Sequence, residues 1–584
     1  MNARDLLRRL WPYGVVAAAV LLVSRQWWNS GLLGGHSSFM DLMRQVVLDD
    51  AIRHGDIWPR FAEAFYANHG SLLFHFYAPL SYYITEIFML VGAPSTVALK
   101  LAMAAGLLLS GVFMAMLARE LFGDYAAACA GAAYVLAPYH LVDVLARHAF
   151  GEALAFAWLP LACWGILGAV RDGSAVRMIA GALGMAFLLL THNITAMISA
   201  PVLALWWVYV SWRYGQRKLR GPLLGVCAGA GGLLLAAFFW IPAFSETNLI
   251  WSTESLTDEY FRYWQHFVYF KQFFKLFWGY GGSTLGPNDG MPFQLGLAHW
   301  ALLAGSVAVF VKRREWRTPL AVCWIIVVGA LFMAHFASAP IWRHIKHLAF
   351  VQFPWRFLVL AVFGASLAAG SVAQALRDAG GKRWGAVLAL LAVMLAFPVY
   401  APYTRSKHTL YIVAKDDWGH FHWQHYLDLA RQPGYQLPEK LVTIAWIRAN
   451  LVRATAREDF LPHAVLEIPT TPPERDVIAV AGEVLTVQAL GPRHYAAEVD
   501  MSAPGPVALE RFWYPGWEAR VDGQWQKTIV YSAAGLTAVE VGTGRHRVEF
   551  NFDSTPLRQT ASIISIITAL ALAVFAIVDR RVRR

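Results

Sequence analysis

Long apolar stretches separated by short basic turns run through most of this chain, and that alternation restricts the folds it can adopt. Stretches of about 18 residues or more recur, and a helix of that length crosses roughly 30 Å of hydrocarbon. The sequence of 584 residues is 57% apolar and only 15% charged, a composition that excludes an ordinary water-soluble globule. The pattern therefore predicts an α-helical protein that crosses a membrane many times.

The basic residues gather in the short turns between the apolar stretches. These turns include residues 213–220, 312–317 and 377–383, and both ends of the chain are basic as well. Short loops rich in Lys and Arg stay in the cytoplasm when a membrane protein inserts. Membrane orientation therefore explains the net charge of +11, so we expect a lipid bilayer and no nucleic acid as partner. With both termini inside, the number of crossings is even.

About thirteen candidate crossings can be counted, so an even number requires that one of them does not cross. The weakest is the segment 78–91, which is short, contains Pro79 and Glu86, and carries the adjacent Tyr82 and Tyr83. Tyrosines favour the membrane–water interface. We predict about twelve transmembrane helices, with segment 78–91 lying flat or re-entrant on the outer face.

One polar region, from about residue 405 to residue 555, contains no apolar run of membrane length. Alternating strands are predicted at 484–489, 495–499 and 507–512, and Gly and Pro separate them. With the turn at Val521-Asp522-Gly523, they predict an antiparallel β-sandwich. The expected division is a transmembrane domain at 1–402, an extracytoplasmic domain at 403–556, and a final transmembrane helix with a basic cytoplasmic tail at 557–584.

Aromatic and cysteine side chains give weaker signals. Trp513, Trp517 and Trp525 could stack on sugar rings or form the core of the sandwich, and the core interpretation is preferred. The four cysteines all fall inside predicted crossings, so no disulfide framework is expected. No haem, Walker, Rossmann or zinc spacing occurs, so we predict no cofactor. Scattered acids leave a divalent cation possible but unsupported.

Ionisable residues that do not belong to the basic turns crowd at the predicted outer ends of the helices. Charges beside a membrane are costly and are candidates for function. The pattern suggests a cavity that opens outward, although each residue could instead be solvated or cap a helix. The candidates are His36, Asp41, Asp49, Asp50, Arg60, Arg147, His148, Glu152, His192 and Arg356.

Several motifs, taken in order, carry a family resemblance over nearly the whole chain. They are Gly35-His36-Ser37, Gly55-Asp56-Ile57-Trp58-Pro59-Arg60, Phe76-Tyr77-Ala78-Pro79-Leu80-Ser81-Tyr82-Tyr83, Gln352-Phe353-Pro354-Trp355-Arg356-Phe357, Glu458-Asp459-Phe460-Leu461-Pro462 and Trp513-Tyr514-Pro515-Gly516-Trp517. The set resembles the GT-C superfamily of integral-membrane glycosyltransferases, and more specifically the YfhO-like and 6-pyruvoyl-tetrahydropterin-synthase-related bacterial membrane proteins. Relatives typically carry an acid directly after the Gly-His pair, where this chain has Ser37; the nearest downstream acid is Asp41.

The resemblance implies a GT-C-like enzyme of the bacterial cytoplasmic membrane. Its donor would be a polyprenyl-phosphate-linked sugar, and its acceptor an extracytoplasmic glycan, lipid or protein. A carboxylate can take the proton of the acceptor, and Asp41 is the candidate for this role. Arg356, Arg147 and His148 would bind the donor phosphate. Secondary candidates are His36, Asp49, Asp50, Arg60, Glu152 and His192. The alternatives are a non-catalytic scaffold that binds glycans and a transporter of a lipid-linked intermediate.

Overall fold

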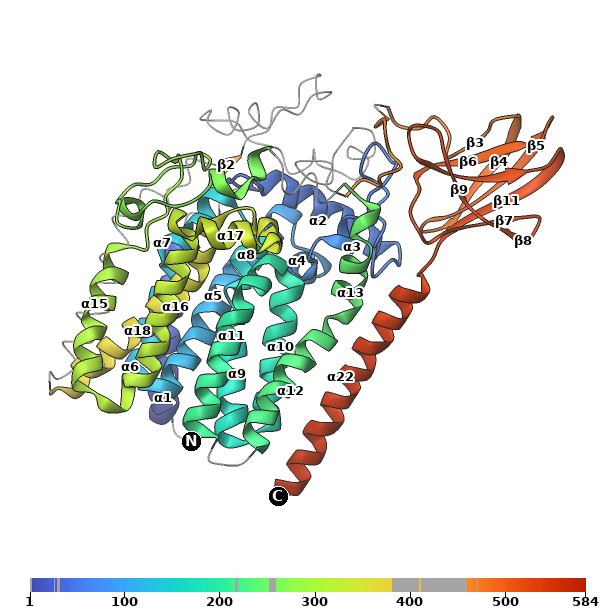
Figure 1. Ribbon diagram of the computed structural model, residues 1–584. Coiled ribbons are helices and arrows are strands. Elements are labelled where there is room, and N and C mark those ends of the chain that lie inside the picture. The colour runs from blue at the N-terminus through green and yellow to red at the C-terminus, as the bar shows by residue number, and fades with distance from the viewer. Residues whose placement is uncertain are drawn as a thin grey trace.

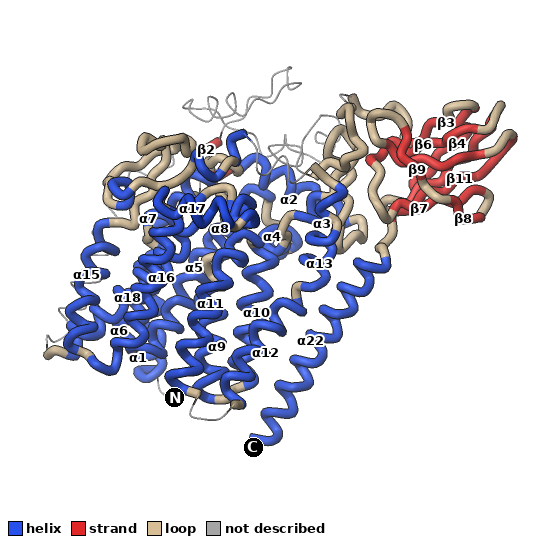
Figure 2. Tube along the Cα trace, in the orientation of Figure 1, coloured by secondary structure: helices blue, strands red, loops and turns tan. Residues whose placement is uncertain are grey.

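The computed structural model describes residues 3–25, 27–28, 32–215, 219–251, 259–380, 409–410, 460–469 and 471–583. A helical bundle forms most of the molecule, a domain of two sheets stands beside one end of it, and a last helix runs back along the bundle (Figure 1). Strand lies almost entirely in that separate domain (Figure 2). The crossing predicted after residue 383 and the first part of the predicted outer domain, including Glu458 and Asp459, lie outside the described residues.

The helices follow the apolar stretches of the sequence. In chain order they are α1 (Ala3–Ser24), α2 (Ser38–Arg53), α3 (Leu73–Phe76), α4 (Leu80–Leu90), α5 (Ser95–Phe122), α6 (Asp124–Val135), α7 (Pro138–Val142), α8 (Phe150–Ala155), α9 (Trp158–Asp172), α10 (Ala175–Thr191), α11 (Asn193–Tyr214), α12 (Arg220–Leu235), α13 (Ala237–Ser245), α15 (Leu297–Lys312), α16 (Arg317–Ala334), α17 (Ala339–His344), α18 (Leu358–Asp378) and α22 (Pro556–Arg583). A π-helix, η1 (Asp143–Arg147), follows α7, and a 3-10 turn, η9 (Pro354–Phe357), leads into α18.

Seven helical stretches in the described part of the chain are long and apolar enough to cross a membrane. The pair α12 and α13, bent by 65° at its break, makes an eighth if it is one span. Shorter apolar helices occur at Arg9–Ser24, Leu80–Leu90, Ala175–Thr191 and Leu297–Lys312. The many-helix membrane fold is thus confirmed, while the number of twelve crossings stays a prediction.

Helix α4 occupies the segment that was predicted not to cross. It has 11 residues, so at 1.5 Å per residue it is about 16 Å long, roughly half of a hydrocarbon core. Figure 1 shows α4 at the upper end of the bundle, beside α2 and α3. Helices α1 and α22 have their free ends together at the opposite end (Figure 1), in keeping with an even number of crossings.

The most deeply buried helical stretches lie at the centre of the bundle. In the stretches Asp124–Arg147, Phe150–Asp172 and Pro354–Asp378, between 94% and 100% of the apolar window is buried inside the protein, whereas only 11% is buried in the stretch Pro556–Arg581. Ala and Gly make up most of α6, and such small side chains let neighbouring helices approach closely. Residues at the ends of these central stretches are therefore held in fixed positions.

The sheet domain consists of two antiparallel sheets. Its strands are β3 (Val477–Ala479), β4 (Gly482–Gly491), β5 (His494–Met501), β6 (Gly505–Phe512), β7 (Trp517–Val521), β8 (Gln524–Gln526), β9 (Ile529–Tyr531), β10 (Leu536–Val541) and β11 (Gly544–Phe552). One sheet has the order β3-β6-β10-β9 and the other β4-β5-β11-β7-β8. A further pair, β1 (Leu32–Leu33) with β2 (Thr409–Leu410), lies outside this domain.

The three predicted strands correspond to β4, β5 and β6, and the predicted turn is present. Asp522 and Gly523, with φ of 51° and 79°, form the two-residue connection of β7 to β8. Positive φ at both positions is the geometry that matches the twist of paired strands, and Asp-Gly adopts it readily. Trp517 is 3% exposed and belongs to the core, as preferred, whereas Trp525 is 57% exposed.

The segment 34–72, which lies in the region predicted to be on the outer side and is here called the first outer loop, packs against the base of the sheet domain. The ring of Phe61 contacts Tyr514, Trp517 and Phe552, with centroid distances of 5.8, 5.5 and 5.3 Å. All four side chains are largely buried. Aromatic pairs at these distances contribute beyond the area they bury. The loop therefore joins the sheet domain to the bundle through an apolar contact.

A network of four polar side chains, here called the junction network, lies beside this contact. An Nη1 hydrogen of Arg60 points to Nδ1 of His75 at 3.1 Å, and Nε2 of His75 lies 2.7 Å from Oε2 of Glu246. Nη2 of Arg558, on α22, lies 2.9 Å from the same oxygen. Because arginine cannot accept a hydrogen bond, Nδ1 of His75 must be the acceptor. The ring is therefore neutral and carries its hydrogen on Nε2.

The neutral ring of His75 predicts a stability change with pH. Burial, with help from the charges of Arg558 and Arg60, lowers the pKa of His75 to about 4. The unfolded chain takes up this proton near pH 6.5, so stability present above that pH is lost as the pH falls toward 4. At pH 5 the loss is about 2 kcal/mol.

The change His75→Gln tests this, because the glutamine amide oxygen can accept the hydrogen bond of Arg60 and the side chain does not titrate. Thermal unfolding of the purified protein at pH 7 and pH 5 should show a smaller loss of Tm in the variant than in the wild type. Equal losses would contradict the neutral assignment.

Candidate functional site

The start of the first outer loop lies directly against the segment that follows α7. The backbone N–H of His36 donates to the carbonyl of Ala146 at 3.1 Å, and that of Ser37 donates to the carbonyl of Arg147 at 3.0 Å. Gly35 permits this approach, because a Cβ there would lie 2.6 Å from Cβ of His148. The two segments are thus fixed to each other although about 110 residues separate them.

Asp41, in the first turn of α2, is the centre of a buried group called here the Asp41 cluster. The hydroxyl of Tyr82 donates to Oδ1 of Asp41 at 2.7 Å, and Nη1 of Arg44 lies 3.5 Å from the same oxygen. Nδ1 of His148 lies 3.2 Å from Oδ2. Asp41 is 1% exposed, so its charge is compensated by these partners rather than by water.

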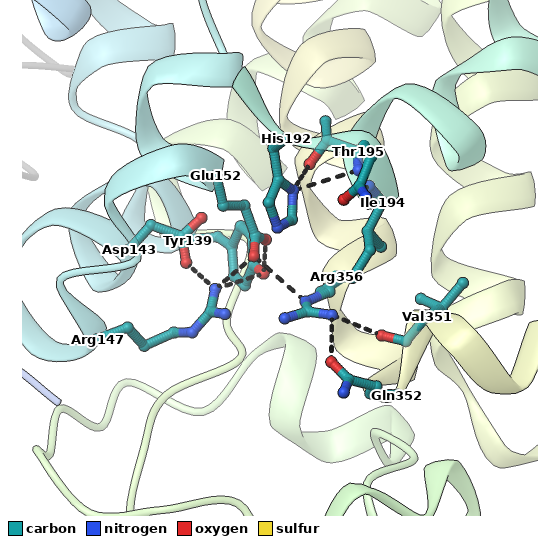
Figure 3. A network of polar contacts seen from close by, with 11 residues as sticks. Tyr139, Asp143, Arg147, Glu152, His192, Ile194, Thr195, Val351, Gln352 and Arg356 are labelled. Atoms are coloured by element: carbon teal, nitrogen blue, oxygen red, sulfur yellow. Dashed lines mark hydrogen bonds and ion pairs between the residues drawn. The ribbon is translucent and has the colours of Figure 1, made fainter. Parts of the chain in front are cut away.

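Glu152, in the first turn of α8, is the centre of a second buried group, the Glu152 cluster (Figure 3). Its Oε2 lies 3.0 Å from Nη1 of Arg147 and 3.3 Å from Nε of Arg356. Its Oε1 accepts a hydrogen bond from the hydroxyl of Tyr139 at 2.7 Å. Asp143 forms an ion pair with Arg147. One carboxylate oxygen therefore holds two guanidinium groups side by side.

Each of these arginines uses only part of its guanidinium for the protein. Every hydrogen bond of Arg147 to a described residue is made by Nη1. Arg356 donates from Nη1 to the carbonyl of Val351 and to the side chain of Gln352, whereas its Nε lies 3.3 Å from Glu152 in an ion pair without a hydrogen bond. Within the described part of the chain, Nη2 of both arginines is left without a polar partner. Each residue is 8% exposed.

Unusual backbone geometry positions both clusters. The π-helix η1 ends at Arg147, and His148 follows with a φ of 49°. Gln352, just before η9, has a φ of 64°. Such conformations cost free energy in residues other than glycine and occur often at functional sites, as π-helical turns do. Consecutive residues thus point into different groups, with Arg147 in the Glu152 cluster and His148 in the Asp41 cluster.

Two further predicted residues lie near these clusters. His192 caps α11, because its Nδ1 accepts the backbone N–H of Thr195 at 3.2 Å, and its ring points toward Glu152 (Figure 3). Nε2 of His36 lies 2.7 Å from the carbonyl of Tyr280, and burial, outweighing that hydrogen bond, lowers the pKa of His36. Both histidines therefore have structural partners at the edge of the site.

Three other predicted residues lie apart from the clusters. Asp49 pairs with Arg53 at 2.7 Å and Asp50 with His54 at 3.4 Å, both one turn along α2. Arg60 belongs to the junction network. Sequence reasoning missed Arg44, Tyr82, Tyr139 and Asp143 as members of the site. The spacing of Asp143 and Arg147, four residues apart on a helix, was the one signal that could have paired them.

The described residues contain no group of three or more His, Cys, Asp or Glu side chains arranged to hold a metal ion. The candidate site consists of the Asp41 cluster and the Glu152 cluster, which are joined through the consecutive residues Arg147 and His148.

The double ion pair of Glu152 predicts a large effect of neutralising it. Glu152→Gln removes from Arg356 its only carboxylate partner among the described residues, and breaking a buried pair in this way costs about 3–5 kcal/mol. The Tm of the purified protein should fall clearly, and Glu152→Asp should restore part of the loss.

Glu120 provides a matched control, because its carboxylate also bridges two arginines. It lies 2.6 Å from Arg171 and 2.9 Å from Arg177, with its side chain 25% exposed. Glu120→Gln should cost less than about 1 kcal/mol, since water replaces the lost partner. Similar losses of Tm at the two positions would contradict a special role for the buried pair.

Several solved structures show a distant likeness to this chain. The oligosaccharyltransferase of Archaeoglobus fulgidus is 14% identical, with 74% of this chain and 61% of that chain covered and a TM-score of 0.41. The arabinofuranosyltransferase AftD from Mycobacteria is 12% identical, with 68% and 26% covered and a TM-score of 0.44. ArnT of Cupriavidus metallidurans, solved with undecaprenyl phosphate, is 17% identical, with 73% and 69% covered and a TM-score of 0.36.

The chain thus spans about three fifths of the archaeal enzyme, and likenesses this distant assign it no activity. No curated protein matched the chain. The model of one family, described as 6-pyruvoyl-tetrahydropterin synthase related domain and as a membrane protein, matches residues 74–406, which is more than half of the sequence. The chain therefore belongs to the 6-pyruvoyl-tetrahydropterin-synthase-related family of membrane proteins.

Proposed function

We propose that this protein is a GT-C-type glycosyltransferase that moves a sugar from a polyprenyl-phosphate donor to an extracytoplasmic glycan, lipid or protein. The observation that carries the proposal is the pair Arg147 and Arg356, held on one oxygen of Glu152 with an Nη2 group free on each. The enzyme would lie in the bacterial cytoplasmic membrane with its sheet domain on the outer side. This side is also where the resemblance of the sequence motifs leads us to expect the chemistry.

The arginine pair suits a phosphate that leaves during the reaction. When the bond between the sugar and the phosphate oxygen breaks, the electron pair goes to the phosphate, whose charge increases. Guanidinium groups donate geometrically matched hydrogen bonds to phosphate oxygens. Donors that are fixed before the reaction stabilise such charge without reorganisation. Glu152 keeps Arg147 and Arg356 in place, so the phosphate would meet two preset cations.

The Asp41 cluster suits the proton of the acceptor hydroxyl. With Nδ1 of His148 donating to Asp41, its Nε2 is the ring nitrogen that can accept a proton, and Nε2 has no partner among the described residues. A carboxylate behind a histidine fixes the tautomer and stabilises the charged ring. The acceptor oxygen would attack the sugar carbon while its proton passes to His148, with Asp41 supplying the negative charge. Asp41 would thereby take the place of the acid that relatives typically carry at the position of Ser37.

Asp41→Asn tests whether the charge of Asp41 supports proton transfer to His148. The variant keeps size and most hydrogen bonding but removes the charge, so transfer should fall by roughly a hundredfold or more while donor binding is preserved. A panel of polyprenyl-phosphate sugars gives the transfer rate, and binding of undecaprenyl phosphate gives the donor affinity. Asp49→Asn is the matched control, being the same change on α2 at an ion pair outside both clusters, and it should transfer at the wild-type rate.

Arg356→Ala tests the phosphate contact. Because the phosphate is bound before and during transfer, both the affinity for undecaprenyl phosphate and the turnover should fall. Arg356→Lys should recover only part, since lysine supplies charge without the planar fork. Unchanged donor affinity in Arg356→Ala would contradict the assignment.

Two further results would decide against the proposal. A wild-type transfer rate in Asp41→Asn would place the proton acceptor elsewhere. If none of the donors supports transfer by the unmodified protein, the scaffold that binds glycans becomes the better interpretation.

A further inference from the structure

A cavity of about 670 Å³ lies where the last helix meets the bundle, away from both clusters. Its walls come from the first outer loop, the break between α12 and α13, the end of the sheet domain and α22. They include Trp58, Arg60, Phe238, Arg493, Ser565 and Ile566. No lining residue belongs to the Asp41 cluster or the Glu152 cluster, so the cavity is separate from the proposed active site.

Two arginines, Arg60 and Arg493, line the cavity. Arg60 forms no ion pair with a described carboxylate, and burial together with the charge of Arg558 lowers its pKa to about 10. Arg493, the second cation of the wall, pairs with Asp56 at 2.8 Å. One carboxylate, Asp553, also lines the cavity. Arg60 is thus the arginine of this wall that has no ion-pair partner among the described residues, and an anion bound beside it would supply that counter-charge.

Two buried N–H donors on this wall also lack partners. Nε1 of Trp58 and Nε of Arg493 are inaccessible to water and make no hydrogen bond to a described residue. The indole of Trp58 is fixed by stacking on Tyr83, with centroids 5.7 Å apart, and by an edge contact with Phe238. Buried donors without acceptors cost free energy and call for an explanation. Since water cannot reach either nitrogen, a ligand in the cavity does not contact them, and the indole of Trp58 contributes a fixed wall.

The other part of the wall is apolar and faces outward. Ile566 is 60% exposed, and Ala569, one turn later on α22, is exposed as well. Only 11% of the apolar window of this helix is buried in the protein, so in a membrane the rest contacts lipid chains. The cavity therefore joins a polar, cationic end to an apolar face open to the bilayer.

We infer that this cavity binds the anionic phosphate head of a membrane lipid, whose chains lie along α22. Arg60 attracts the head, and the indole of Trp58 forms the wall beside it. Ile566 and Ala569 contact the chains. The inference does not depend on glycosyl transfer. A glycerophospholipid and a polyprenyl phosphate share the chemistry that the site recognises.

The same lipid would strengthen a weak point of the bundle. The 65° bend between α12 and α13 interrupts the helical hydrogen bonds. The hydroxyl of Ser565 accepts the N–H of Phe238 at 2.9 Å, and Arg60 donates to the carbonyl of Phe238 at 2.8 Å. Both residues that satisfy the break also line the cavity. A ligand that holds Arg60 therefore stabilises the contact between the bend and α22.

Thermal unfolding of the delipidated full-length protein in a neutral detergent tests this inference. The probes are dioctanoyl phosphatidylglycerol, farnesyl phosphate, dioctanoyl phosphatidylcholine and inorganic phosphate. A ligand of the folded state raises Tm, by about 3 °C or more near saturation. We expect this rise with an anionic lipid and not with phosphatidylcholine or inorganic phosphate.

Variants of residues in the cavity wall test whether the lipid that raises Tm binds in this cavity. Arg60→Gln removes the cation, and Ala569→Phe fills the apolar end without changing any charge, so both should abolish the rise. Ile567→Phe is the matched control, because Ile567 is an exposed neighbour on α22 that does not line the cavity. It should keep the full rise.

A rise with phosphatidylglycerol, with farnesyl phosphate or with both supports the inference and identifies the source of the phosphate. An equal rise with phosphatidylcholine or with inorganic phosphate overturns it. So does a rise that persists in both Arg60→Gln and Ala569→Phe. Because the readout is Tm, a failure here is distinct from a failure of sugar transfer.

Discussion

The shared ion pair of Glu152 is the contact on which the arrangement of the outer end of the bundle depends. Two guanidinium groups buried without a counter-charge would be very costly in a membrane protein. The carboxylate that compensates them comes from α8, whereas Arg147 ends η1 and Arg356 precedes α18. Three buried helical stretches are thus tied at one point, which also explains why they can enclose so much charge.

The outer loop and the sheet domain extend this arrangement rather than standing apart from it. The loop reaches the bundle through Gly35 and Asp41, and it reaches the sheets through Phe61. A change in the position of the sheets would therefore reach the Asp41 cluster through one continuous segment. This connection gives the sheet domain a physical route to the buried clusters of the helical bundle.

Patterns along the chain indicated more of the fold than of the site. The periodicity of apolar residues predicted the helices and strands β4 to β6, and the Asp-Gly pair predicted the turn at Asp522-Gly523. Each of these features depends on residues that are close in the sequence. Sidedness placed Asp41, Arg147 and Arg356 among the candidates, yet it could not separate them from Asp50 or Arg60. All five are polar residues predicted at the outer surface, and only packing decides which of them meet. Tyr82 and Tyr139 were not predicted as members of the site, because the sequence alone does not distinguish a buried tyrosine that donates a hydrogen bond from a tyrosine at the membrane interface.

The ion pair between Glu246 and Arg558 has a consequence for the order of synthesis. The two residues are 312 positions apart, so Glu246 leaves the ribosome long before its partner exists. Until α22 is made, the carboxylate of Glu246 has His75 but lacks this cation. Helix α22 therefore completes the charge balance of a region built much earlier, and this part of the bundle reaches its final form only after α22 has been made.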